Sequence, residues 1–310
     1  MERVRLTRDL RAAGYESAEL ARLRRAGTIR SVRRGAYVLD PTPVQETVSA
    51  HREQIAAAVG LLTAPAVVSH MSAAVLHGLP LWDAELARVH LIRDRPNGGH
   101  VDPLVHLHVM PLRRGDVTEI DGIAVTSLAR TVCDLARTLS SFKAVPIGDA
   151  ALARGLEPRE LADVLARCRG WRGVVRARRT IDFLDARSES PGESCSRVVL
   201  HEQGLPKPDL QVKVYDDRGY LLVRSDFGWI ERRTLGEYDG MGKYGELRSP
   251  DQTAEDVVLD EKDREDRLRD HGWQIARWTW PLLRTPVELR RRVERAFARA
   301  SPSAEPGPFR

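Results

Sequence analysis

The sequence of 310 residues is poor in lysine, in cysteine and in long apolar stretches. Lysine supplies only five of the 49 basic residues, so arginine carries most of the positive charge. Cys133, Cys168 and Cys195 are far apart and odd in number, which argues against a cysteine metal site and indicates a reducing cytoplasm. There is no 18-residue apolar run and no apolar N-terminal core, so neither a membrane span nor a secretory signal is expected.

The positive charge that is present is concentrated near the N-terminus. Residues 1–35 hold ten arginines and four acids, a net charge of +6, although the whole chain carries only +5. The acid-rich part is residues 226–270, with fourteen acids and eight bases. A chain of this length with 42 % hydrophobic residues predicts two or three folded domains.

The basic N-terminal region predicts two short helices followed by a hairpin. The helices are expected at Leu6–Ala13 and Ser17–Ala26, with Thr7 and Ser17 as N-caps, and the hairpin strands at Ile29–Val32 and Ala36–Leu39. Arg22 and Arg25 share one face of the second helix, and Arg33 and Arg34 form the hairpin tip. This order is typical of a winged helix-turn-helix, so these four arginines are candidate DNA contacts.

The run RLRRAGTIRSVRRGAYVL within this region carries a family resemblance. Residues 3–40 resemble the N-terminal domain of the AbiEi-like antitoxins of type IV abortive-infection systems. The resemblance implies a winged helix that binds operator DNA, repression of the protein's own operon and a toxin protein as partner. Residues 43–187 resemble the second domain of that family more loosely.

The middle region, 43–187, is predicted to be a mixed α/β scaffold without a catalytic motif. Its elements include a hairpin, Val117–Ile120 and Ile123–Thr126, that turns at Asp121-Gly122. Its histidines lie seven apart, as His70 and His77, or alternate on a strand, as His106 and His108. None of these spacings is that of two zinc ligands four apart on a helix. They are therefore predicted to be hydrogen-bonded core or surface residues.

Three carboxylates gather at the ends of two predicted strands in the C-terminal part. Tyr220–Phe227 and Thr234–Tyr238 are expected to form a hairpin, with Asp226 at the end of the first strand. Glu237 and Asp239 are two residues apart and face the same way on a strand. Carboxylates in such a group repel one another unless a cation lies between them, and Mg²⁺ prefers oxygen ligands.

The order of elements around these strands carries a second resemblance. Helix, three strands, helix and strand over about Ser190–Leu283 resembles the PD-(D/E)XK nuclease superfamily, specifically its very-short-patch-repair-endonuclease-like domain of unknown function. The resemblance implies that Glu193, Asp226 and Glu237 hold a Mg²⁺ or Mn²⁺ ion and cleave DNA. The superfamily usually has a lysine two residues after the strand glutamate. Asp239 stands there instead and is a further candidate ligand, so Lys243 is the candidate catalytic cation.

The sequence therefore predicts a multi-domain α/β protein with four parts. These are a winged helix-turn-helix at 1–42, an α/β domain at 43–187, a restriction-endonuclease-like αβββαβ domain at 188–300 and a disordered tail at 301–310. Three functions stay open: a DNA-binding autoregulator that also cleaves DNA with a divalent metal, an autorepressor and antitoxin without cleavage, and a catalytically dead nuclease fold that binds a toxin partner.

Overall fold

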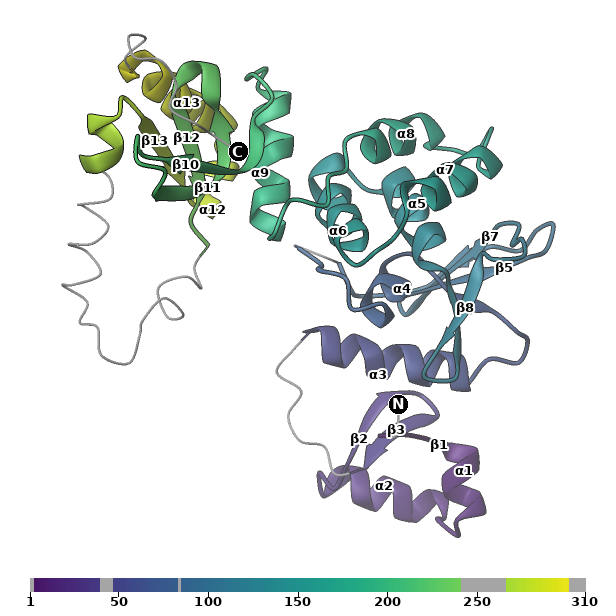
Figure 1. Ribbon diagram of the computed structural model, residues 1–310. Coiled ribbons are helices and arrows are strands. Elements are labelled where there is room, and N and C mark those ends of the chain that lie inside the picture. The colour runs from purple at the N-terminus through teal and green to yellow at the C-terminus, as the bar shows by residue number, and fades with distance from the viewer. Residues whose placement is uncertain (1–2, 40–46, 83–84, 241–265, 301–310) are drawn as a thin grey trace. The chain divides into compact units, whose positions relative to one another are not determined.

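Helices and three β-sheets make up the computed structural model, so the chain is a mixed α/β protein as the sequence predicted (Figure 1). Residues 3–39, 47–82, 85–240 and 266–300 are described. The chain divides into an N-terminal unit, Met1–Leu184, and a C-terminal unit, Asp185–Arg310. The domain boundary predicted after residue 42 and the predicted tail lie outside the described residues. None of the described helices has the length and apolarity needed to cross a membrane.

The N-terminal unit begins with a three-stranded antiparallel sheet of order β1-β3-β2. Its elements in chain order are β1 (Val4–Leu6), α1 (Thr7–Ala12), α2 (Ser17–Arg25), β2 (Ile29–Arg33) and β3 (Ala36–Leu39). The predicted helices and hairpin are thus present, and β1 is an additional strand. The predicted N-caps are wrong, because Leu6 and Glu16 hold the cap positions and neither makes a side-chain cap hydrogen bond.

Apolar side chains cover both faces of this small sheet. Leu10, Leu20 and Ile29 form one cluster, which joins α1 and α2 to β2. Leu6, Ala36 and Ala57 form the other, which joins the sheet to α3 (Thr47–Gly60). The three strands therefore lie between α1 and α2 on one side and α3 on the other.

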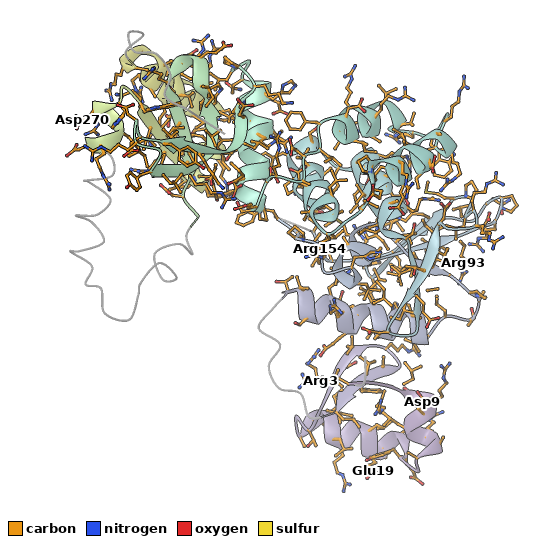
Figure 2. The ribbon with its side chains drawn as sticks, viewed as in Figure 1. Arg3, Asp9, Glu19, Arg93, Arg154 and Asp270 are labelled. Atoms are coloured by element: carbon orange, nitrogen blue, oxygen red, sulfur yellow. The ribbon has the colours of Figure 1, made fainter. Side chains whose placement is uncertain are left out.

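A six-stranded mixed sheet of order β6-β7-β5-β4-β9-β8 follows. Its elements are β4 (Val67–Val68), α4 (His70–Leu76), β5 (Val89–Arg93), β6 (His100–Val101), β7 (Val105–Val109), β8 (Val117–Ile120) and β9 (Ile123–Thr126). The hairpin turn at Asp121 and Gly122 is as predicted, since both residues have the positive φ that a tight hairpin turn needs. The Arg154 side chain, labelled in Figure 2, donates to the His77 carbonyl after α4.

Four helices complete the N-terminal unit: α5 (Leu128–Thr138), α6 (Ser141–Ala153), α7 (Pro158–Arg167) and α8 (Val174–Asp182). Arg130 is 1 % exposed and binds the carboxylates of Asp116 and Asp134 at 2.9 and 2.8 Å. Arg137 donates to Asp134, and Arg167 to Asp116. Since removing one member would leave a buried charge unpaired, this network fixes α5 and α7 against the segment before β8.

The C-terminal unit contains a four-stranded sheet of order β10-β11-β12-β13. Its elements are α9 (Pro191–Glu202), β10 (Asp209–Tyr215), β11 (Leu221–Trp229), β12 (Thr234–Tyr238), β13 (Gln274–Trp278), α12 (Trp280–Leu283) and α13 (Pro286–Arg299). The first three strands are antiparallel, and β13 adds in parallel to β12. Residues 266–270 are helical, and the rest of the helix predicted over 257–270 lies outside the described residues.

Candidate functional site

Asp226 and Glu237 lie on neighbouring strands of the C-terminal sheet. The register pairs Phe227 with Gly236 and Gly228 with Leu235, and its continuation by one pair sets Asp226 opposite Glu237. Directly opposed residues of an antiparallel pair project from the same face. Asp226 Oδ2 also accepts a 2.9 Å hydrogen bond from the backbone N–H of Tyr238. Two strands therefore bring the two predicted carboxylates to one place.

The outer strands add two residues to this row. Gln211 lies on β10 between the pairs Leu210–Phe227 and Val212–Ser225, so it faces Asp226. On the other side, β13 pairs Arg277 with Glu237. The Arg277 Nε donates to Glu237 Oε2 at 2.8 Å, which is a charge-assisted hydrogen bond. Residue order in the sheet is thus amide, carboxylate, carboxylate and guanidinium.

Glu193 is 5 % exposed in the first turn of α9 and acts as part of the helix cap. Its Oε1 accepts from Ser190 Oγ at 2.7 Å, and its Oε2 accepts from Glu189 N at 2.9 Å. Gln211 Nε2 donates to the same Oε2, also at 2.9 Å. Gln211 has a φ of 56°, a conformation that non-glycine residues adopt rarely. Gln211 therefore connects Glu193 on α9 to the row of side chains across the sheet.

Arg224 provides further evidence that Glu193 and Asp226 lie near each other. A hydrogen bond with Glu189 raises the pKa of the Arg224 guanidinium, and the charges of Asp226 and Glu193 contribute to the same rise. Arg224 therefore interacts electrostatically with both carboxylates. We use "carboxylate site" for Glu193, Asp226 and Glu237 together.

The carboxylate site fits Mg²⁺ through its chemistry. The oxygens of the three carboxylates do not all lie within 4.8 Å of one another. Within the described ranges, only the nitrogens of one group of three histidines lie that close together. However, Mg²⁺ keeps several waters and needs one or two carboxylates from the protein, and Asp226 and Glu237 supply two. Asp239 follows β12, with its N–H bonded to Trp278 O at 2.9 Å. Lys243, the predicted catalytic cation, lies outside the described residues.

The candidate DNA-contacting arginines occupy different environments. Arg22 and Arg25 are exposed in the last turn of α2, where Arg22 lies 3.6 Å from Glu19, which Figure 2 labels. Arg34 is exposed in the β2–β3 turn, whereas Arg33 is half-buried. Arg24 is also exposed and adds a third positive charge to the end of α2.

The hairpin tip packs against the rest of the N-terminal unit. A Cβ atom on Gly35 would lie 3.2 Å from the Leu61 side chain, which follows α3. Burial raises the pKa of Asp102, but hydrogen bonds from the Leu104 and Val105 amides and nearby charges, Arg33 among them, lower it overall. Arg33 is thus close to Asp102, between β6 and β7. Arg34, which is exposed, is the more accessible of the two arginines to DNA.

Sequence reasoning missed Gln211, Arg277 and a histidine cluster. The first two belong to outer strands, and only the strand order places them beside the predicted carboxylates. The sequence did place Gln211 on the strand that comes just before the strand of Asp226, which was a signal that the two residues could be neighbours. The histidines, His70, His90 and His108, come from three elements, so spacing along one helix or strand could not predict them.

No family model matches the chain. It is 31 % identical over 236 residues to the uncharacterized protein Rv2248 of Mycobacterium tuberculosis (strain ATCC 25618 / H37Rv), a match that covers 74 % of this chain and 80 % of the relative. The uncharacterized protein MT2308 of strain CDC 1551 / Oshkosh gives the same values. The crystal structure of the RV2827C protein from M. tuberculosis is similar with a TM-score of 0.41 and 15 % identity, over 62 % of this chain and 75 % of that one.

Proposed function

The chain belongs to the family of the mycobacterial proteins Rv2248 and MT2308, and we propose that it is a DNA-binding protein that cleaves DNA with a divalent metal at the carboxylate site. The observation that carries the proposal is the register that sets Asp226 opposite Glu237. Gln211 and Glu193 extend the row on one side and Arg277 on the other. The row supports a restriction-endonuclease-like C-terminal unit.

In this proposal Asp226 and Glu237 hold Mg²⁺ or Mn²⁺ directly. When bound, such an ion polarises a phosphoryl oxygen and activates a water molecule for hydrolysis. Glu193 and Gln211 position the Asp226 side of the site, because their hydrogen bond links α9 to β10. Residues 226–270, which include Asp226 and Glu237, hold fourteen acids and eight bases. Carboxylates without a bound cation would repel a phosphodiester, so a cation helps DNA to approach them.

Arg277 takes the role that the missing lysine has in the PD-(D/E)XK superfamily. Its guanidinium lies beside Glu237 on the parallel neighbour strand. A guanidinium has several N–H donors and can donate two parallel hydrogen bonds to the oxygens of one phosphate. In this position it can stabilise the charge that develops on a phosphate during cleavage.

DNA binding is proposed for the N-terminal unit, through a winged helix-turn-helix. The exposed arginines of α2 and Arg34 form its positive surface, and guanidinium groups contact phosphates and guanine edges. With the AbiEi-like resemblance, this surface supports a transcriptional autoregulator and antitoxin with a toxin partner.

A second candidate function is a catalytically dead nuclease fold that serves as a scaffold for the toxin. The Arg277–Glu237 ion pair favours it, because the guanidinium already neutralises a carboxylate that the metal needs. The two candidates differ in one observable property, which is metal-dependent cleavage.

The test is a cleavage assay with the full chain on supercoiled plasmid and on single-stranded DNA. Asp226→Asn keeps the shape of the side chain and an oxygen that accepts from Tyr238 N, but it removes the charge. Glu231→Gln is the matched control, since Glu231 is exposed at the turn between β11 and β12. We expect Mg²⁺ or Mn²⁺ to support cleavage by wild type and Glu231→Gln, and EDTA or Asp226→Asn to abolish it.

Cleavage that Asp226→Asn retains would overturn the proposed site. Wild-type protein that binds DNA but leaves both substrates intact with Mn²⁺ would overturn the cleavage proposal and favour the catalytically dead fold. A mobility shift on the same DNA separates these cases, because binding by the N-terminal unit does not depend on Asp226.

A further inference from the structure

Three histidines meet in the N-terminal unit, remote in sequence from the carboxylate site. His70 begins α4, His90 lies in β5 and His108 lies in β7. One ring nitrogen from each lies within 4.8 Å of the other two, and within the described ranges no other group of three His, Cys, Asp or Glu ligands is this close. His70 is buried, and the other two are partly buried.

We propose that His70, His90 and His108 bind one transition-metal ion of the zinc class. Imidazole nitrogen suits Zn²⁺, Cu²⁺, Ni²⁺ and iron, whereas Mg²⁺ and Ca²⁺ prefer oxygen. Three histidines with a fourth position for water are the ligand set of catalytic zinc sites, while structural sites usually have four protein ligands.

Backbone hydrogen bonds hold the three elements in place. β5 and β7 are parallel and pair His90 with His106, so His108, two residues on, projects from the same face as His90. The start of α4 is joined to β5 twice, by Ser69 N to His90 O and by His90 N to Ser72 Oγ, both at 2.9 Å. Ligands carried by such a fixed scaffold need little reorganisation to bind an ion.

The His90–His108 pair has almost the spacing of two ligands of one ion. His90 Nδ1 and His108 Nε2 are 3.0 Å apart and share one proton in a hydrogen bond. Two nitrogens at zinc's bond length in a tetrahedral site would be about 3.3 Å apart. An ion that replaces this proton therefore has to open the pair by only a few tenths of an ångström.

His70 supplies the third ligand after a rotation of its ring. The ring is stacked on that of His108, with centroids 3.9 Å apart, so binding turns one ring nitrogen toward the pair. Ser69 Oγ lies 3.0 Å from His70 Nδ1. A proton on Nδ1 donated to this oxygen leaves Nε2 with its lone pair, which is how outer hydrogen bonds orient metal-binding histidines. The φ of 49° at His70 is strained, as residues at functional sites often are.

The imidazoles are neutral at pH 7, as metal ligands must be. Burial, with smaller contributions from neighbouring histidines and arginines, lowers the pKa of His90 to about 4 and that of His108 to about 3. Burial also lowers the pKa of His70 well below its usual value, with contributions from Arg137 and Arg130. These arginines repel a dication as well, so the affinity should be below that of a site with an anionic ligand.

The test is a titration of the full chain with Zn²⁺ and with Co²⁺ after treatment with a chelator. With excess Mg²⁺ present to fill the carboxylate site, we expect one equivalent of Zn²⁺ to bind and to raise the melting temperature of wild type, and Co²⁺ to give the intense absorption of a four-coordinate site. His90→Ala and His108→Ala should lose both effects. His100→Ala is the control, because His100 is exposed on β6 of the same sheet.

Wild-type protein that takes up no Zn²⁺, or a Co²⁺ spectrum typical of six-coordinate water ligands, would overturn the proposal. So would a loss of binding in His100→Ala equal to that in His90→Ala. Where an alanine variant fails to fold, the absence of four-coordinate Co²⁺ absorption from the folded wild-type protein still overturns the proposal.

Discussion

At the scale of single residues, one carboxylate oxygen has two competing uses. Glu237 Oε2 accepts from Arg277 Nε at 2.8 Å, and in the proposed function Glu237 also binds a divalent ion. A quarter of the Arg277 side chain is exposed. The guanidinium can therefore move away from Glu237 Oε2 and be solvated by water instead. Arg277 therefore weakens metal binding to Glu237. From the same position, it stabilises the negative charge that develops on the phosphate during cleavage.

Replacing Arg277 with glutamine should separate these two effects. Arg277→Gln removes the competing cation, so we expect Mn²⁺ to bind about tenfold more tightly, which corresponds to about 1.4 kcal/mol. Cleavage at saturating Mn²⁺ should fall by about tenfold or more, since the charge beside the phosphate is lost. Calorimetry and a plasmid assay measure the two quantities.

Arg290→Gln provides the control for this prediction, because Arg290 is exposed on α13, where it forms an ion pair with Glu294. Its affinity and rate should equal those of wild type. Weaker Mn²⁺ binding in Arg277→Gln would show that the guanidinium organises Glu237 and does not compete for it.

At the scale of elements, α9 depends on a glycine where it meets β12. A Cβ atom on Gly192 would lie 1.9 Å from the Tyr238 ring, so no side chain fits there without a shift. We expect Gly192→Ala to destabilise the C-terminal unit by about 1–3 kcal/mol, the usual effect of overpacking. Urea unfolding followed by tryptophan fluorescence measures the loss.

Gly240→Ala is the matched control for Gly192→Ala. A Cβ atom on Gly240 would meet the same Tyr238 ring at 3.7 Å, an ordinary contact. Its stability should remain within about 0.5 kcal/mol of wild type. Equal stability of the two variants would mean that α9 can move away from β12 at little cost.

The exposed end of α2 is the second element that carries a prediction. If Arg22 and Arg25 contact phosphates, their joint replacement by alanine should weaken binding to all DNA sequences alike. The slope of log affinity against log salt should fall by about two units, since each phosphate contact contributes roughly 0.9 through counterion release. Fluorescence anisotropy at several salt concentrations measures this slope.

Arg178→Ala with Arg179→Ala controls for the loss of two charges, because both arginines are exposed on α8. This pair should keep the wild-type slope. An unchanged slope in the α2 variant would move the DNA surface to Arg34 and the rest of the N-terminal region.

At the scale of the whole molecule, the sequence predicted local elements better than the contacts between them. The β8–β9 hairpin was predictable because Asp121-Gly122 has a strong local turn preference. Asp226 and Glu237 were predictable because each belongs to an apolar run of strand length. The predicted end of the first strand was wrong, because β11 continues to Trp229 and Asp226 lies within it. Short strands such as β4 and β6 carry too few residues to show a period. Partners across the sheet, Arg277 above all, depend on strand order, which no local pattern encodes.

The histidine cluster also lowers the stability of the folded chain at acid pH. His90 and His108 have pKa values lowered by burial to about 4 and about 3, against 6.5 when unfolded. Below pH 6.5 the unfolded chain binds more protons than the folded one, so stability falls as pH drops, by on the order of a few kcal/mol near pH 4.

Urea unfolding in EDTA between pH 7 and pH 4 measures this dependence. His108→Gln should flatten it, because the variant lacks one of the groups whose protonation favours unfolding. The control, His100→Gln, should keep the wild-type dependence, since His100 is exposed. A wild-type stability that is constant over this range would contradict the buried neutral histidines.

Calorimetric titration of the full chain with Mn²⁺ tests the central claim most directly, because it measures whether Asp226 and Glu237 hold an ion together. Wild type and Glu231→Gln should bind Mn²⁺ with the same affinity. Asp226→Asn and Glu237→Gln should each lower it by tenfold or more, since each removes one of two anionic ligands. Equal affinity in all four proteins, or no binding by wild type, would contradict the account.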